Sequence, residues 1–236
     1  SSDIPTLDLS KATDQQSFQT ANTTMEGLTR VDAEGKVQPG VAESWETSED
    51  GLTWTFKLRK NSTWSNGTPV TAHDFEYSWK RTLTPETAAE YSYIMADIVG
   101  SSTKEIQENG VDGVGVKALD DYTLEVKLNR PVAYFAELVS FQVFFPQNQA
   151  FVESCGDAYG SAADKQLYNG PFTLTSWKME DQFTMEKNPN YWDAANVKLN
   201  KINTKVVKDT GAEVSLYEDG QIDRAILSSD YVDKYK

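Results

Sequence analysis

The residues best suited to nucleophilic or metal chemistry are histidine and cysteine, and the chain contains one of each. A serine or cysteine triad needs an imidazole beside its nucleophile, and His73 is the sole histidine. It falls in the first turn of an expected helix, where we predict a solvent-exposed side chain. Cys155 has no second cysteine with which to form an intrachain disulfide or a metal cage. The two residues therefore favour neither hydrolytic catalysis nor a cysteine-based metal site.

Acidic pairs could support acid–base chemistry or bind a cation, but the chain has 36 acidic residues, so a chosen pair carries little information. Glu49–Asp50 lacks the alternating oxygen ligands of a calcium loop, and Asp120–Asp121 falls in an expected hairpin turn. The glycines at 110, 113 and 115 are not followed by the Gly-Lys-Ser/Thr of a phosphate-binding loop. We therefore expect no catalytic residue, no metal and no cofactor, and we predict that the protein is not an enzyme.

The overall composition is that of an ordinary globular protein. With 236 residues, 39% of them hydrophobic and 25% charged, the chain can form one large domain or two smaller ones. Its net charge of −14 repels phosphate backbones, so nucleic acid is not an expected partner. No apolar run approaches the roughly 20 residues that cross a bilayer. Ser1–Ile4 lacks the basic start and apolar core of an export signal, so we expect any such signal or lipid anchor to lie outside this sequence.

The elements that would position any site are clearest in the stretch Trp54–Arg81. Trp54, Phe56 and Leu58 alternate with polar residues, which predicts a strand with one buried face. A turn around Gly67 follows, and Thr71 then stands three residues before Asp74, a spacing typical of a helix start. We predict a helix from Ala72 that ends near Thr84, because the residue before a proline avoids the helical region.

Further elements follow from similar patterns along the chain. Hairpins are expected over residues 28–37, 114–128 and 172–187, the last followed by a strand over 201–207. A strand is expected over Ile4–Leu9, and helices over Phe18–Gly27, Pro85–Ala96, after Pro131, after Asn148 and over Thr210–Gly220. The aromatic run Phe141–Phe145 reads as core.

Several of these segments carry motifs that together resemble a known family. The motifs are Pro39–Glu46, Asp50–Leu52, Trp64–Ala72, Val116–Asp121, Asn169–Phe172, Asn188–Asp193 and Gly220–Asp223. Their content and order resemble the oligopeptide- and dipeptide-binding proteins of ABC importers. The resemblance implies a mixed α/β, periplasmic-binding-protein-like fold, of which this chain would be the amino-terminal portion, with the second lobe absent. It implies a first lobe formed by residues 1–27 and 149–236, an inserted subdomain over 28–148, and a hinge strand at Phe141–Phe145.

The resemblance also implies ligand-binding residues. The segment matching Thr13, Asp14, Gln15 and Gln16 lines the cleft in these receptors, and Tyr91 matches a tyrosine that contacts ligand. From the residues alone, Thr13–Gln16 reads as a solvated loop with a helix cap, and Tyr91 as a tyrosine half-buried at a helix surface. Both interpretations stay open.

The function implied is that of a monomeric receptor that captures short peptides outside the membrane and delivers them to an ABC permease and ATPase complex. Two lobes would close on the peptide. The protein would be lipid-anchored at the cell surface or free in the periplasm. Alternatives are a non-peptide solute, such as a nickel complex, a sugar or an opine, and a surface receptor for peptide signals. Because the resembled proteins anchor the peptide's amino terminus from the later lobe, we expect residues 1–236 alone to bind peptides weakly or undetectably.

Overall fold

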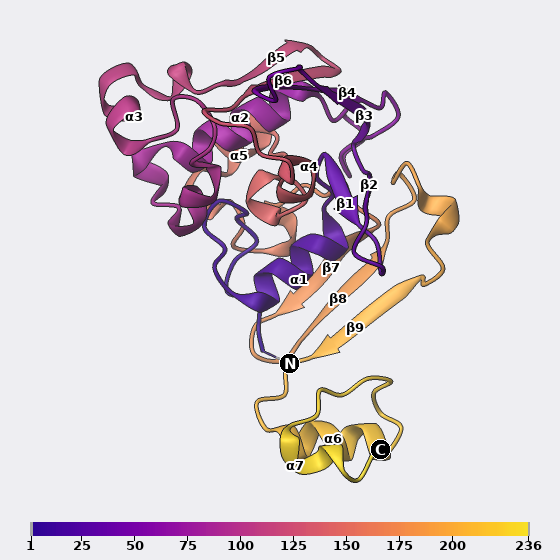
Figure 1. Cartoon of the computed structure of the whole chain (residues 1–236). Helices are drawn as coiled ribbons and strands as arrows, with labels where there is room; N and C mark the ends of the chain where they lie inside the picture. The colour runs from indigo at the N-terminus through magenta and orange to yellow at the C-terminus, as the bar shows by residue number, and fades with distance from the viewer. Residues whose placement is uncertain (1, 236) are drawn as a thin grey trace.

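The computed structural model describes residues 2–235, and the strands within that range form three antiparallel sheets (Figure 1). The first pairs β1 (Thr29–Val31) with β2 (Val37–Pro39). The second consists of β3 (Ala42–Thr47), β4 (Thr53–Leu58), β6 (Thr123–Lys127) and β5 (Val116–Asp120), in that spatial order. The third has the order β7-β8-β9, with bounds Phe172–Lys178, Gln182–Lys187 and Lys201–Lys205. Sheets and helices together confirm the predicted mixed α/β architecture.

The helices lie between and around these sheets. The α-helices are α1 (Gln15–Thr24), α2 (Ala72–Leu83), α3 (Thr103–Asn109), α4 (Phe135–Leu138), α5 (Gln149–Cys155), α6 (Thr210–Glu218) and α7 (Ser229–Val232). Short 3-10 helices join them, among them η1 (Pro85–Thr87), η2 (Glu90–Met95) and η4 (Gln142–Phe144). A 3-10 geometry therefore replaces most of the single helix predicted over Pro85–Ala96.

The four-stranded sheet and α2 form the main core, as the alternation predicted. Phe56 and Leu58 of β4 are buried, and α2 packs on β5 with Phe75 and Trp79 fully covered. Burial of such large apolar side chains is the main favourable term in folding. The predicted helix start at Ala72 and the end at Thr84 are confirmed.

The start of α2 is fixed by a buried carboxylate. Asp74 Oδ2 accepts hydrogen bonds from the backbone N–H of Thr71 at 2.9 Å and from Trp64 Nε1 at 3.1 Å. Burial raises the pKa of Asp74 to about 6, even though both hydrogen bonds favour the charged form. His73, beside it, is exposed as predicted and lies 3.3 Å from Asp121.

A second buried network ties the amino-terminal segment to α2. The carboxylate of Asp8 receives two hydrogen bonds from Arg81, both at 2.8 Å, and Arg81 also donates to Gln147 Oε1 at 2.9 Å. Gln147 in turn donates to Ser10 and Ser78 at 2.8 and 3.0 Å. Such bidentate pairing of arginine with carboxylate is geometrically specific. Residues from three distant parts of the chain are therefore held in one position.

Three local predictions are wrong. Ile4–Leu9 forms no strand, because its backbone bonds to side chains and to Gly160 in place of a neighbouring strand. The first helix ends at Thr24 with Met25 extended, so Gly27 does not terminate it. Phe141–Phe145 contains the 3-10 turn η4 and no strand, since its backbone bonds are local i to i+3 contacts.

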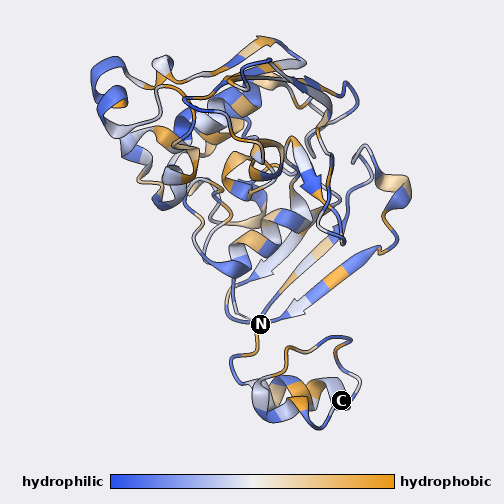
Figure 2. Cartoon of the chain, viewed as in Figure 1, coloured by the Kyte–Doolittle hydropathy of each residue, from blue (hydrophilic) through white to orange (hydrophobic). Residues whose placement is uncertain are grey.

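The carboxyl-terminal helices α6 and α7 stand apart from the sheets (Figure 1). This segment has hydrophobic positions among its polar ones (Figure 2), and Ile226 and Tyr217 are 56% and 44% exposed. Over residues 2–235, no helix combines the length and apolar character needed to span a membrane.

Candidate functional site

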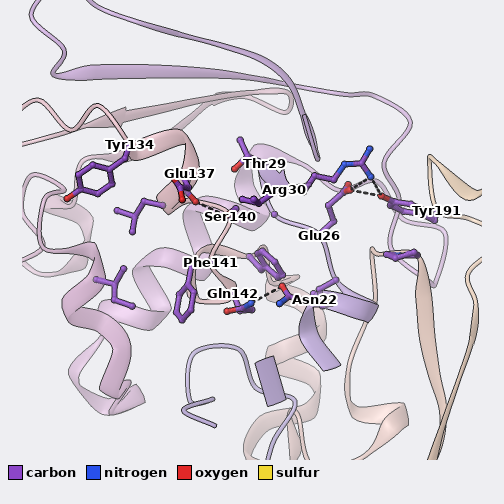
Figure 3. Close-up of a pocket in the computed structure, with 17 residues that line it drawn as sticks. Asn22, Glu26, Thr29, Arg30, Tyr134, Glu137, Ser140, Phe141, Gln142 and Tyr191 are labelled. Atoms are coloured by element: carbon purple, nitrogen blue, oxygen red, sulfur yellow. Dashed lines mark hydrogen bonds and ion pairs between the residues drawn. The ribbon is translucent and has the colours of Figure 1, made fainter. Parts of the chain in front are cut away.

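A cavity of about 1090 Å³ lies where segments far apart in sequence meet (Figure 3). Its lining comes from the end of α1, from β1 and from the segment that runs from α4 to η4, which contact one another. Ile94 of η2, Pro171 and Tyr191 also line it. The walls are mixed in character, with aromatic, aliphatic and charged side chains. Concave sites of this size and character are typical of small-ligand binding.

A buried carboxylate organises one end of the cavity. Glu26 is 5% exposed, and it accepts hydrogen bonds from the Tyr191 hydroxyl at 2.5 Å and from Trp192 Nε1 at 2.6 Å. Arg30 lies 3.8 Å from the same carboxylate and donates to the Tyr191 hydroxyl at 3.2 Å. Burial raises the pKa of Glu26, against the opposing effect of the two hydrogen bonds and of Arg30. Burial and the nearby carboxylate also raise the pKa of Tyr191.

Trp192 is held between this carboxylate and a second arginine. The Arg59 guanidinium lies 3.4 Å from the centroid of the Trp192 ring, a cation–π geometry, and Arg59 Nε donates to the Gly40 carbonyl at 2.6 Å. Gly40 must be glycine here, because a Cβ would lie 2.7 Å from the carbonyl oxygen of Gly27. The close approach of these two backbone segments positions β1 at the cavity.

A different set of groups lines the other end. Gln142, 6% exposed, donates through Nε2 to Asn22 Oδ1 at 2.8 Å. Its Oε1 has no hydrogen-bond partner within the described part of the chain. Glu137 is exposed on the neighbouring turn, and its backbone carbonyl accepts from the Ser140 hydroxyl at 2.6 Å. This end of the cavity therefore has one exposed carboxylate, of Glu137, and one lining residue, Gln142, whose buried amide oxygen lacks a partner in the described chain.

The residues predicted from the resemblance at 13–16 lie at the start of α1 and do not line this cavity. Asp14 is the N-cap of α1, and its carboxylate accepts from the Ser17 N–H at 2.8 Å. Thr13 is exposed beside it, and Gln15 and Gln16 form the first turn. The helix cap read from the residues alone is thus present, and a contact with ligand stays a prediction.

Tyr91 lies nearer the cavity, although it does not line it. Its ring packs edge-on against Phe18 with centroids 5.5 Å apart, and it contacts Phe141 with centroids 5.9 Å apart. Phe141 belongs to the cavity wall. Tyr91 is partly buried, with the exposed Tyr93 stacked on it at 5.8 Å. Its role in ligand contact also stays a prediction.

Sequence reasoning did not identify Glu26, Glu137 or Gln142 as site residues. Glu26 falls near the end of the helix predicted over Phe18–Gly27, and its hydrogen-bond partners Tyr191 and Trp192 are some 165 residues away in the sequence. The signal that could have pointed to it was the motif Asn188–Asp193, which contains both partners. Within residues 2–235, no group of three or more potential metal ligands occurs.

Comparison with known proteins matches residues 36–236 to the family described as bacterial extracellular solute-binding proteins, family 5 middle. The oligopeptide-binding protein OppA of Bacillus subtilis is 42% identical over 202 residues, which are 86% of this chain and 37% of that protein. The chain therefore spans about 40% of the length of such curated relatives.

Solved structures agree in fold. The substrate-binding domain of an oligopeptide ABC transporter from Bacillus anthracis superposes with a TM-score of 0.96 and 49% identity over 99% of this chain and 45% of that one. Listeria monocytogenes OppA bound to peptide superposes with a TM-score of 0.95 and 42% identity over 99% of this chain and 46% of that one.

Proposed function

The chain belongs to the bacterial extracellular solute-binding proteins of family 5, and we propose that it is the amino-terminal part of a receptor that captures short peptides for an ABC importer. The observation that carries this proposal is its likeness, at 42% identity and a TM-score of 0.95, to a relative whose structure holds a peptide. The open cavity between α1, β1 and the α4–η4 segment supports it. The relatives are solute-binding proteins and not enzymes.

We propose that residues 1–27 and 149–236 belong to one lobe, into which residues 28–148 are inserted. Contact between α1 and β7 supports this division. The Asn169 side chain also bonds to both backbone groups of Glu26, at 3.0 and 2.9 Å. The inserted part contributes β1 and the α4–η4 segment to the cavity, so ligand would contact both parts.

Capture would occur by closure of a second lobe, supplied by the part of the longer relatives that this chain does not span. A peptide held in extended form can satisfy its backbone with main-chain partners whatever its sequence. Contacts on both lobes would stabilise the closed state, which the permease and ATPase complex recognises. In this proposal Thr13–Gln16 and Tyr91 contact the ligand on closure, and the receptor is a monomer. It acts outside the cytoplasm, either lipid-anchored or periplasmic.

The test uses the longest natural polypeptide that contains these 236 residues, purified from rich medium. Native mass spectrometry should reveal co-purified short peptides, and calorimetry should detect their rebinding. Tyr91→Ala should weaken binding several-fold, while Tyr217→Ala, a substitution in the distant α6, should not. Co-purification of a sugar, an opine or a nickel complex in place of peptides would contradict the proposal. Residues 1–236 alone should bind weakly, and a low-micromolar affinity for that chain would contradict the two-lobed mechanism.

A further inference from the structure

We propose that the cavity accepts a basic side chain of the bound peptide, lysine or arginine, at the wall formed by Glu137 and Gln142. The inference rests on the proposed peptide-binding function and adds the class of side chain that this wall selects. The two residues flank the same short turn between α4 and η4, and both line the cavity (Figure 3).

The charges that line the cavity are already paired, with one exception. Glu26 is bonded to two aromatic donors and lies near Arg30, and Arg30 is also 3.3 Å from Asp193. Glu137 is different, because no ion-pair partner for it occurs in residues 2–235 and its side chain is exposed. The uncompensated charge of the cavity is therefore negative, and a cation is the complementary ligand group.

Hydrogen-bonding capacity points the same way. Gln142 Oε1 is buried and has no partner in the described chain, and such an oxygen needs an N–H donor. The hydroxyls of Thr29, Ser140 and Tyr191 already donate their protons, to two main-chain carbonyls and to a carboxylate. These hydroxyls can only accept further bonds. An occupant rich in donors, such as an ammonium or guanidinium group, suits this lining better than an acidic one.

The surroundings also suit the stem of such a side chain. Leu138, Phe141 and Ile94 line the same region and are each partly buried. Lysine and arginine pack their methylene groups along apolar surface while the charged head contacts polar groups. The cavity of about 1090 Å³ is large enough for either side chain together with part of the peptide backbone.

The test compares tetra-alanine peptides in which each position in turn carries lysine, norleucine or glutamate. Binding is measured by calorimetry on the longest natural polypeptide that contains these residues. At one position lysine should bind roughly two- to fivefold more tightly than norleucine, the range expected of a partly exposed ion pair. Glu137→Gln should abolish that preference and leave the norleucine peptide unchanged. Glu49→Gln, which removes the same charge from an exposed turn, should preserve it.

The role of Gln142 is tested separately. Gln142→Met keeps the size of the side chain and removes the amide, so it should weaken binding of the lysine peptide several-fold. Asn22→Ala removes the bond between the two amides but keeps the Gln142 oxygen, and should have a smaller effect. Unchanged thermal unfolding would show that each variant is folded.

The outcomes separate this inference from the function on which it rests. Binding of neutral peptides with no lysine preference at any position would overturn the basic-side-chain inference alone. A preference that survives Glu137→Gln would also overturn it. If no peptide binds to the unmodified protein, the proposed function fails and this inference fails with it.

Discussion

Replacement of Glu26 should reveal how firmly the cavity wall is held. In Glu26→Ala, two hydrogen bonds to a charged acceptor disappear, each worth about 1.5–3 kcal/mol. The variant also no longer carries the cost of burying a carboxylate, which is large enough to raise the pKa of Glu26. We therefore expect a net loss of about 2–4 kcal/mol in the free energy of unfolding.

Glu26→Gln should cost less, about 1 kcal/mol, because its amide oxygen can still accept from Trp192. Its amide N–H can donate to the Tyr191 hydroxyl, which can rotate to accept. Urea unfolding, followed by tryptophan fluorescence, measures the free energy of unfolding of both variants. The dependence of that free energy on urea concentration should be the same as in the unmodified chain. Glu137→Gln is the matched control, since an exposed substitution should change stability by less than about 0.5 kcal/mol.

The pH dependence has a defined sign. Since the pKa of Glu26 is raised above its ordinary value of 4.5, the folded state binds this proton more tightly than the unfolded state. Stability relative to Glu26→Gln should therefore rise as the pH falls from 7 through the raised pKa, and level off below 4.5. The reasoning is refuted if the Ala and Gln variants both unfold like the unmodified chain, or if the difference falls as the pH falls.

Three further predictions concern the framework. The unmodified chain should become more stable than Asp74→Asn by up to about 3 kcal/mol as the pH falls through about 6, because the pKa of Asp74 in the folded state lies above its ordinary value of 3.8. Urea unfolding at several pH values measures this difference, and a difference that shrinks as the pH falls would contradict the prediction. Arg81→Ala should cost about 3–5 kcal/mol in the same assay by leaving Asp8 buried and unpaired, and a loss below about 1 kcal/mol would show that the pair is not buried as described. Gly170→Ala places a Cβ 2.6 Å from backbone atoms and should lower the free energy of unfolding by about 1–3 kcal/mol. Gly113→Ala, whose Cβ would have its nearest contact at 3.3 Å, should cost less, and equal losses in the two variants would contradict the close packing at Gly170.

Local elements were predictable from the sequence because their signals lie within a few residues. The alternation in β4 and the start of α2 at Ala72 are examples, and both match the structure. The prediction failed at Ile4–Leu9, where Ile4, Leu7 and Leu9 are buried but the backbone of Leu7 bonds to Gly160 and not to a partner strand. Burial alone does not distinguish a strand from an extended segment bonded to side chains.

The cavity could not be predicted in the same way, because it is assembled from distant segments. Glu26 acquires its role from Tyr191 and Trp192, and Gln142 acquires its role from Asn22, 120 residues earlier. No local pattern records such pairings. The resemblance to a family supplied candidates at 13–16 and 91, which lie at a helix start and behind the cavity wall. None of these residues lines the cavity, and their contact with ligand stays a prediction.

Two buried networks tie segments next to the cavity lining to the rest of the body. Asp8, Arg81 and Gln147 fix the amino-terminal segment to α2 and to the chain that follows η4. Glu26 and Trp192 fix the end of α1 to the segment after β8. Because partly broken buried networks cost several kcal/mol, movement within this body is unfavourable. In the proposed two-lobed receptor, ligand-driven closure should therefore occur between this body and the second lobe, with the cavity wall moving as one unit.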